Sequence, residues 1–318
     1  MNHWSNCMEP FRKKNMLFGN WTTLILPVNK NDSIDYELLK DEIDFMIECH
    51  VDGIYSNGTA GEFYTQDREE FYTIQSILSE KCNRNNIPFQ IGASHMSPQE
   101  SLFRIAVARD MKPVAIQVIL PDWFPVNIET AVKFLKNAAE ESGGIPLVVY
   151  NPPHAKVTLE AEDWLAIISE VPSIIGIKVA DGDSSWYKNM KEVMEKISVF
   201  IPGHHLATGI RQGALGAYSN MACLHPKGNQ MWSDLIRSDL TAGLELEKRI
   251  RSFMEIYISP YLTRGYPNHA CDKCMAVAGG WLPGLQTRLR FPYSYIPQDE
   301  AIEIGKIARR EIPEFFNS

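Results

Sequence analysis

The sequence predicts an α/β protein, specifically a (β/α)8 TIM barrel with a helical extension at its C-terminal end. Two observations lead to this prediction: short apolar runs recur eight times along the chain, and longer segments with helical periodicity separate them. Eight strands that alternate with helices are the count of a closed parallel barrel. An open, doubly wound sheet is the main alternative. It would favour a glycine-rich phosphate loop after the first strand, and "WTTLILPVNKND" contains none.

The apolar runs are short and have the length of strands. The predicted strands cover 21–28, 53–57, 88–94, 114–120, 146–151, 174–180, 198–203 and 216–222. The segment 35–50 represents the helices between them, because its apolar residues recur at helical spacing. These strands and the helices between them would form the barrel in the order in which they occur along the chain.

The domain organisation follows from where the strands stop. No strand is predicted after residue 228, and the remaining sequence has helical patterns without a glycine/serine-rich or proline-rich linker. We therefore expect an N-terminal extension at 1–17, a barrel at 18–228, and a helical extension at 229–318 that packs on the barrel.

Composition excludes several classes of function. The 318 residues are 45% hydrophobic and 22% charged, as in an ordinary globular protein, and the net charge of -8 argues against binding nucleic acid. No apolar run reaches the roughly 18 residues that span a membrane, and the first residues lack the apolar core of a signal peptide. A cytoplasmic protein without membrane or nucleic-acid partners is expected.

The six cysteines are scattered and do not suggest a disulfide framework. Cys271 and Cys274 have CxxC spacing, but no second pair or histidines follow at the spacing of a zinc site. Two thiols on one face of a helix is the favoured interpretation, and no metal site is predicted.

Lys178 is the most informative candidate for chemistry. It lies in "IIGIKVADGD", whose apolar residues occupy both faces of the strand, so this strand is expected to be buried on both sides. Burial disfavours the charged form of a lysine and lowers its pKa, and a neutral amine can form a Schiff base with a ketone. The alternatives are a lysine whose charged end reaches out to solvent and a lysine that forms an ion pair with Asp181 or Asp183 just downstream.

Two further strand ends add to this hypothesis, since active sites of barrels lie at the C-terminal ends of the strands. Tyr150 ends the strand before that of Lys178, where a phenol can pass a proton to a Schiff-base intermediate. In "SNGTAGEFY", Gly58 and Gly61 allow a tight turn that aims N–H groups at an anion, and Thr59 adds a hydroxyl donor. A small carboxylate would fit there. A tyrosine at a strand mouth and an ordinary strand-to-helix turn are the non-functional alternatives.

These elements together resemble the dihydrodipicolinate synthase/N-acetylneuraminate lyase family of class I, Schiff-base aldolases. "GTAGEFYTQDREE" is similar to the family's G-[ST]-T-G-E loop, "VVYNPP" to its tyrosine strand end, and "GIKVADGD" to its lysine strand. "GHHLATGIRQGALGAYSNMACLHP" and "LRFPYSYIPQDE" resemble its seventh-to-eighth strand region and a segment near its C-terminus. The likeness runs from about residue 18 to 312.

The resemblance implies a lyase that is a homotetrameric barrel with a C-terminal helical bundle. It implies that Lys178 forms the Schiff base with pyruvate or another 2-oxo acid and that Tyr150 transfers protons. Thr59, with the backbone of Thr59 and Ala60, would hold the carboxylate of the 2-oxo acid. No metal or organic cofactor is expected, because the lysine itself provides the electron sink.

Three departures from the family pattern concern the substrate. Ala60 stands where the family usually has a second hydroxyl residue. "LPDWFP" places Asp122 and Trp123 where dihydrodipicolinate synthases have two tyrosines, one of which joins a proton relay. Ala155 stands where those synthases have an arginine that binds the carboxylate of the aldehyde substrate.

These departures favour aldol cleavage, aldol condensation or dehydration of a substrate like a 2-oxo-3-deoxy sugar acid, with an aldehyde or sugar acid as the other reactant. The alternatives are an authentic 4-hydroxy-tetrahydrodipicolinate synthase and a paralogue that only binds or senses a 2-oxo acid. His95, His204 and His205 are weaker candidates for donors or acid/base groups at the site. The predicted catalytic residues are Lys178, Tyr150 and Thr59, and the predicted substrate-binding residues are Gly58, Thr59, Ala60, Trp123, His154 and Ser219.

Overall fold

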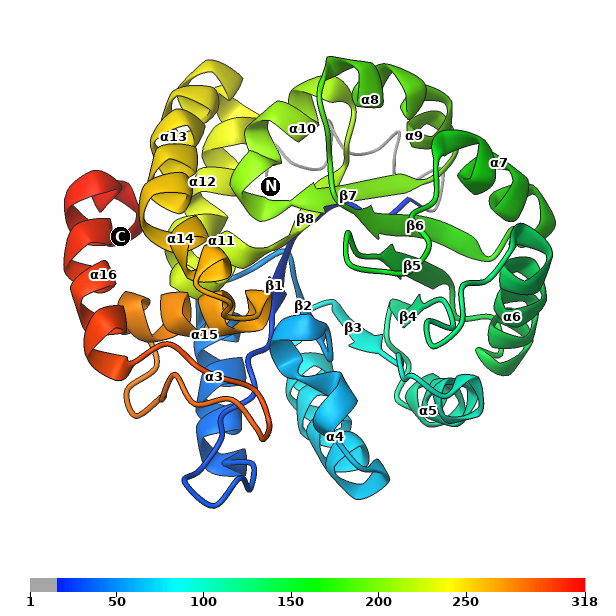
Figure 1. Cartoon of the computed structure of the whole chain (residues 1–318), viewed down its shortest axis with the longest axis horizontal. Coiled ribbons are helices and arrows are strands. Elements are labelled where there is room, and N and C mark those ends of the chain that lie inside the picture. Colours follow the sequence, from blue (N-terminus) through cyan, green and yellow to red (C-terminus); the bar gives the residue numbers. More distant parts are fainter. Residues whose placement is uncertain (1–15, 318) are drawn as a thin grey trace.

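The computed structural model describes residues 16–317, and they form a closed barrel of eight parallel strands in chain order, with β8 pairing with β1 (Figure 1). This confirms the predicted fold class. The strands are β1 Gly19–Thr23, β2 Gly53–Ser56, β3 Phe89–Gly92, β4 Ala115–Ile119, β5 Leu147–Asn151, β6 Ile174–Val179, β7 Ser198–Pro202 and β8 Gly216–Ser219.

Helices surround the barrel and continue beyond β8. Those between strands are α3 Tyr36–Glu48, α4 Arg68–Asn85, α5 Pro98–Asp110, α6 Ile128–Glu141, α7 Ala161–Glu170, α8 Ser184–Asn189, α9 Lys191–Lys196 and α10 Leu206–Gln212. The helices after β8 are α11 Asn220–Leu224, α12 Pro226–Ser238, α13 Leu240–Phe253, α14 Ser259–Thr263, α15 Asn268–Gly279 and α16 Gln298–Glu311. None of the helices in the described part of the chain is both long and apolar enough to cross a membrane.

All eight strands are shorter than their apolar runs predict, and β1 and β8 end furthest before the ends of their runs. The first run extends to Val28, but β1 ends at Thr23, and the Ile25 N–H donates to the Glu42 carboxylate of α3 (2.6 Å) instead of continuing a ladder. The eighth run extends to Ala222, but β8 ends at Ser219, whose hydroxyl accepts the Ala222 N–H and begins α11. In both places a side-chain acceptor competes with strand pairing for the backbone N–H.

The interior of the barrel has its own small core, separate from the larger core between the strands and the helices. It consists of Trp21, Tyr55, Ala115, Val148, Phe200 and Tyr218. The phenol of Tyr218 donates to the Gln90 amide oxygen (2.6 Å), and the phenol of Tyr55 donates to the Gln117 amide oxygen. These side chains fill the barrel interior, and one of them, Phe200, is in register with Lys178 of β6.

The C-terminal helices pack along the β1 and β8 side of the barrel (Figure 1). Helix α15 contacts α11, α16 and the short turn η1 Thr59–Gly61 that follows β2. The boundary predicted at residue 228 falls inside α12, and most of the predicted N-terminal extension lies outside the described residues. Because α15 contacts a loop at the mouth of the barrel, the helical extension is close to the candidate site.

Candidate active site

Lys178 lies inside the barrel on β6, directly opposite Tyr150 in the register with β5. Its Nζ is 4.1 Å from the centroid of the Tyr150 ring and 5.3 Å from those of Tyr55 and Tyr218. The amine is therefore enclosed by three aromatic rings.

This enclosure changes the protonation of the lysine. Loss of hydration on burial lowers the pKa of Lys178 from 10.5 to about 8, although the nearby Asp272 carboxylate acts in the opposite direction. At pH 7, Lys178 is then a neutral amine in about a tenth of the molecules. At the ordinary pKa of a lysine it would be neutral in less than about a thousandth of them. Lys178 has the environment of a nucleophile, and Asp181, proposed above as its alternative ion-pair partner, instead binds His205 (2.8 Å) and Tyr187 (2.9 Å).

Tyr150 and Thr59 lie together at the mouth of the barrel. Burial raises the pKa of the Tyr150 phenol, while a hydrogen bond with the Thr59 side chain lowers it. Thr59 begins the turn η1, in which the N–H groups of Gly61 and Glu62 donate to the carbonyls of Gly58 and Thr59 (3.0 Å each). The tight turn therefore delivers the threonine hydroxyl to the phenol.

A cavity of about 370 Å³ opens beside the lysine and connects these groups. Of the predicted site residues, Thr59, Ala60, Tyr150, His154 and Lys178 line it. The remaining lining side chains with polar or titratable groups are Thr23, His204, Tyr218, Asn220, Cys223, Asn268 and Asp272. The arrangement places a low-pKa amine, a phenol, a hydroxyl and a carboxylate around one small space.

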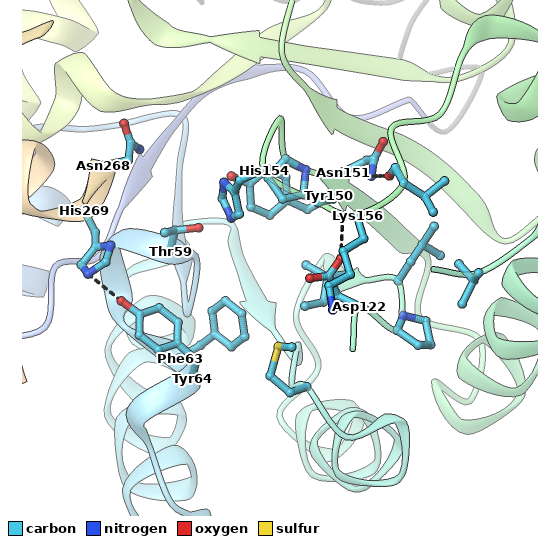
Figure 2. Close-up of a pocket in the computed structure, with 18 of the residues that line it drawn as sticks. Thr59, Phe63, Tyr64, Asp122, Tyr150, Asn151, His154, Lys156, Asn268 and His269 are labelled. Carbon is cyan, nitrogen blue, oxygen red and sulfur yellow. Dashed lines mark hydrogen bonds between the residues drawn. The ribbon is translucent and has the colours of Figure 1, made fainter. Parts of the chain in front are cut away.

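A second cavity of about 650 Å³ adjoins the first and shares four lining residues with it: Thr59, Tyr150, His154 and Asn268 (Figure 2). Apart from these four, most of its lining residues are apolar or aromatic. The Lys156 amine donates to the Trp123 carbonyl, and the Lys156 N–H donates to the Asp122 carboxylate (2.9 Å). Lys156, the one lysine among the described residues that line this cavity, therefore already binds other groups of the protein.

Three predicted binding residues do not line either cavity. Gly58 lies behind the turn, where a Cβ would come within 2.6 Å of the Tyr55 ring, so glycine is needed for packing. Trp123 is 71% exposed, on the loop before α6, and its ring stacks against Lys156. Ser219 is fully buried, where it caps α11 and donates to Asn229 (3.2 Å). In the structure, none of these three residues contributes to the walls of the two cavities.

Other residues of the cavity were missed by sequence reasoning or given little weight. Asp272 and Asn268 come from α15, almost a hundred residues after Lys178. His204, a weak candidate above, lines the cavity, and burial lowers its pKa to about 4, so its imidazole is neutral near pH 7. One feature of the sequence could have pointed to a role for α15: two charged residues, Asp272 and Lys273, stand side by side in a segment otherwise suited to burial.

A buried ion pair connects α15 to the turn at Thr59. Lys273 donates to Glu62 (2.5 Å) and to the Arg288 carbonyl (2.8 Å), and the Arg290 N–H donates to the other Glu62 oxygen (2.9 Å). Both members of the Lys273–Glu62 pair have fully buried side chains. The pair thus fixes the position of α15 relative to the turn.

The CxxC cysteines lie on the same helix. Cys271 and Cys274 are both buried in α15 and form no disulfide. Among residues 16–317, no group of three or more His, Cys, Asp or Glu side chains is arranged to hold a metal ion.

Comparison with known proteins identifies the family of the chain. The model of the dihydrodipicolinate synthetase family matches residues 16–279. The chain belongs to this family. Family members are lyases of the class I aldolase type that act on small molecules, and this protein is accordingly a lyase.

Curated relatives in the family share modest identity with the chain. The 4-hydroxy-tetrahydrodipicolinate synthase of Neisseria meningitidis serogroup C is 28% identical over 238 residues, which are 74% of this chain and 80% of the relative. The protein of the same name from Cytophaga hutchinsonii is 30% identical over 237 residues, or 73% of this chain and 77% of the relative.

Solved structures of family members share the fold. A prophage protein of the dihydrodipicolinic acid synthase family from E. coli K12, solved in complex with pyruvate, superposes with a TM-score of 0.81 at 19% identity, covering 93% of this chain and 99% of that one. The N-acetylneuraminate lyase of Mycoplasma synoviae gives a TM-score of 0.77 at 17% identity, covering 95% and 99%.

Proposed function

We propose that this protein is a Schiff-base-forming lyase that acts on pyruvate or another 2-oxo acid. The observation that carries the proposal is Lys178, an amine with a pKa of about 8 that faces a small cavity inside the barrel. The Nζ lone pair attacks the keto carbon, and loss of water gives an iminium bonded to the lysine. The iminium withdraws electrons from the adjacent carbon, so a bond to that carbon can break or form.

The surrounding groups have roles that follow from their positions. The turn at Thr59 and Ala60 holds the carboxylate of the 2-oxo acid, with the threonine hydroxyl as one donor. Tyr150 is hydrogen-bonded to Thr59 and in contact with Lys178. It transfers the proton that accompanies cleavage or formation of the carbon–carbon or carbon–oxygen bond. The lysine supplies the electron sink, so the proposed chemistry uses no metal or organic cofactor.

The second reactant occupies the larger, more apolar cavity. Ala155 lines this cavity where a synthase of the lysine pathway would have a carboxylate-binding arginine, and Lys156 is engaged by Asp122 and Trp123. A second reactant that has no carboxylate near Ala155 therefore fits this cavity better than a reactant that has one. The walls of this cavity therefore favour an aldolase or dehydratase that acts on a substrate like a 2-oxo-3-deoxy sugar acid. They fit a 4-hydroxy-tetrahydrodipicolinate synthase less well.

The first experiment is to trap the Schiff base. The protein is incubated with pyruvate and sodium borohydride, and intact-protein mass spectrometry is followed by peptide mapping. We expect the mass of a reduced pyruvyl adduct on Lys178 in the wild type and no adduct in Lys178→Ala. If neither pyruvate nor longer 2-oxo acids give an adduct, the proposed Schiff-base chemistry of Lys178 is wrong.

A further inference from the structure

Asp272 is a buried carboxylate that the proposed reaction has not used. It is only 8% exposed, it lies in the second turn of α15, and it lines the cavity that contains Lys178. Within residues 16–317 it has no hydrogen bond and no ion pair within 4.0 Å. Burying a carboxylate without such partners is costly, so a carboxylate in this position points to a role in the cavity.

The charges around Asp272 single out Lys178 as its partner. Burial raises the pKa of Asp272 to about 7, and the one charge that lowers it is that of Lys178. The other titratable groups that feel the carboxylate are Tyr150 on β5, Cys223 on α11 and Cys271 on α15. Lys273, the neighbouring cation, is bound to Glu62. The amine and the carboxyl group therefore share one low-dielectric space.

We propose that Asp272 is a catalytic residue, the acid that expels water during formation of the Schiff base and then the counter-ion of the iminium. This proposal rests on the Schiff-base function proposed for Lys178. The neutral amine adds to the keto carbon, and its proton passes to the keto oxygen to give a carbinolamine. The Asp272 carboxyl group protonates the hydroxyl of the carbinolamine, the C–O bond breaks, and the nitrogen lone pair forms the C=N bond.

The products of this step are water, a protonated iminium on Lys178 and the Asp272 carboxylate, so a neutral pair becomes an ion pair and the charge balances. The same carboxylate accepts the proton back when water attacks the iminium to release product. Tyr150 is less suited to expelling water, because burial raises the pKa of its phenol still further from neutrality.

The test compares the rate of borohydride trapping with pyruvate in the wild type and in Asp272→Asn, which keeps the shape and removes the acid. At pH 7 and saturating pyruvate we expect the variant to be about 100-fold slower, within the range for loss of a general acid. The wild-type rate should pass through a maximum between about pH 7 and 8, whereas the rate of the variant should only rise with pH.

Asp181→Asn is the matched control, because Asp181 is also a buried carboxylate but binds His205 and Tyr187 outside the cavity. We expect its trapping rate to stay within threefold of the wild type. Asp272→Ala provides a second measurement: formic acid, in equilibrium with added formate, should donate the missing proton from the space that the side chain leaves and restore the trapping rate in proportion to its concentration, which loss of packing alone would not allow.

The outcomes separate the two proposals. Absence of an adduct in the wild type refutes the Schiff-base function itself. An adduct in the wild type that forms equally fast in Asp272→Asn, with an unchanged pH profile, refutes the role of Asp272 alone. A slow Asp272→Ala that formate does not restore, together with an unchanged pH profile in Asp272→Asn, assigns Asp272 to packing and also overturns the inference.

Discussion

At the scale of single residues, the candidate site separates two tasks that depend on different protons. Asp272 lines the same cavity as Lys178 and interacts with its charge, whereas Tyr150 contacts both the lysine and Thr59 at the mouth of the cavity. Formation of the Schiff base needs an acid near the leaving hydroxyl. Cleavage or condensation needs a group beside the second reactant, and Tyr150 lines both cavities. We therefore assign the later proton transfer to Tyr150.

This assignment predicts that Tyr150→Phe slows turnover much more than it slows trapping of pyruvate. Turnover should fall by about 10²- to 10⁴-fold, the range for a positioned acid or base, while trapping of pyruvate on Lys178 should stay within about tenfold of the wild type. Trapping and steady-state turnover of the natural substrate, measured on the same preparation, check it. An equal loss of both rates would show that Tyr150 acts in formation of the Schiff base as well.

At the scale of elements, the position of α15 is fixed by the Lys273–Glu62 pair. Glu62 has a left-handed backbone conformation, with φ of 51°, and its two carboxylate oxygens accept from Lys273 and from the Arg290 N–H. Removing one member of a buried pair leaves the other charge without compensation, which costs much more than removing both. The turn at Thr59 and the helix that carries Asp272 thus depend on the same contact.

Lys273→Met should therefore lower the free energy of unfolding by about 3 to 5 kcal/mol. Replacing both residues, in Lys273→Met/Glu62→Gln, should recover at least about 2 kcal/mol of this loss, because no buried charge remains unpaired. Urea unfolding of the wild type, both single variants and the double variant checks the cycle. Strictly additive losses would mean that the two side chains do not stabilise each other.

The same helix shows why the site could be predicted only in part. Lys178 and Tyr150 lie near the ends of short apolar runs and Thr59 just after one, and parallel strands in a barrel bring such ends together regardless of loop sequence. Asp272 belongs to no strand, and its position depends on how α15 packs against η1 and α11, which local periodicity does not specify. Trp123 follows β4 and Ser219 is the last residue of β8, but the first is exposed on its loop and the second caps a helix. Strand ends locate a site without giving the direction of every side chain.

At the scale of the whole molecule, half-buried and buried histidines connect separate parts of the fold, and we expect them to lower its stability in acid. His225 begins α12, its Nδ1 accepts the Gly228 N–H (3.2 Å), and its ring lies edge-on to Phe45 of α3 and to Phe316 near the C-terminus. Burial, together with the charges of Arg309 and Lys227, lowers the pKa of His225 to about 4. Burial likewise lowers the pKa values of His204 and His269 to about 4.

Between pH 6.5 and about 4, the unfolded chain binds a proton at His225 and the folded chain does not. Unfolding therefore takes up protons in this window, and the free energy of unfolding falls as the pH falls, by up to about 3 kcal/mol from this residue. His225→Asn keeps an acceptor suited to the first turn of α12 but does not titrate. Urea unfolding at pH 7 and at pH 4.5 should show a smaller loss of stability in the variant than in the wild type. Equal losses in both would mean that the contacts of His225 with α3 and the C-terminus do not keep its imidazole neutral.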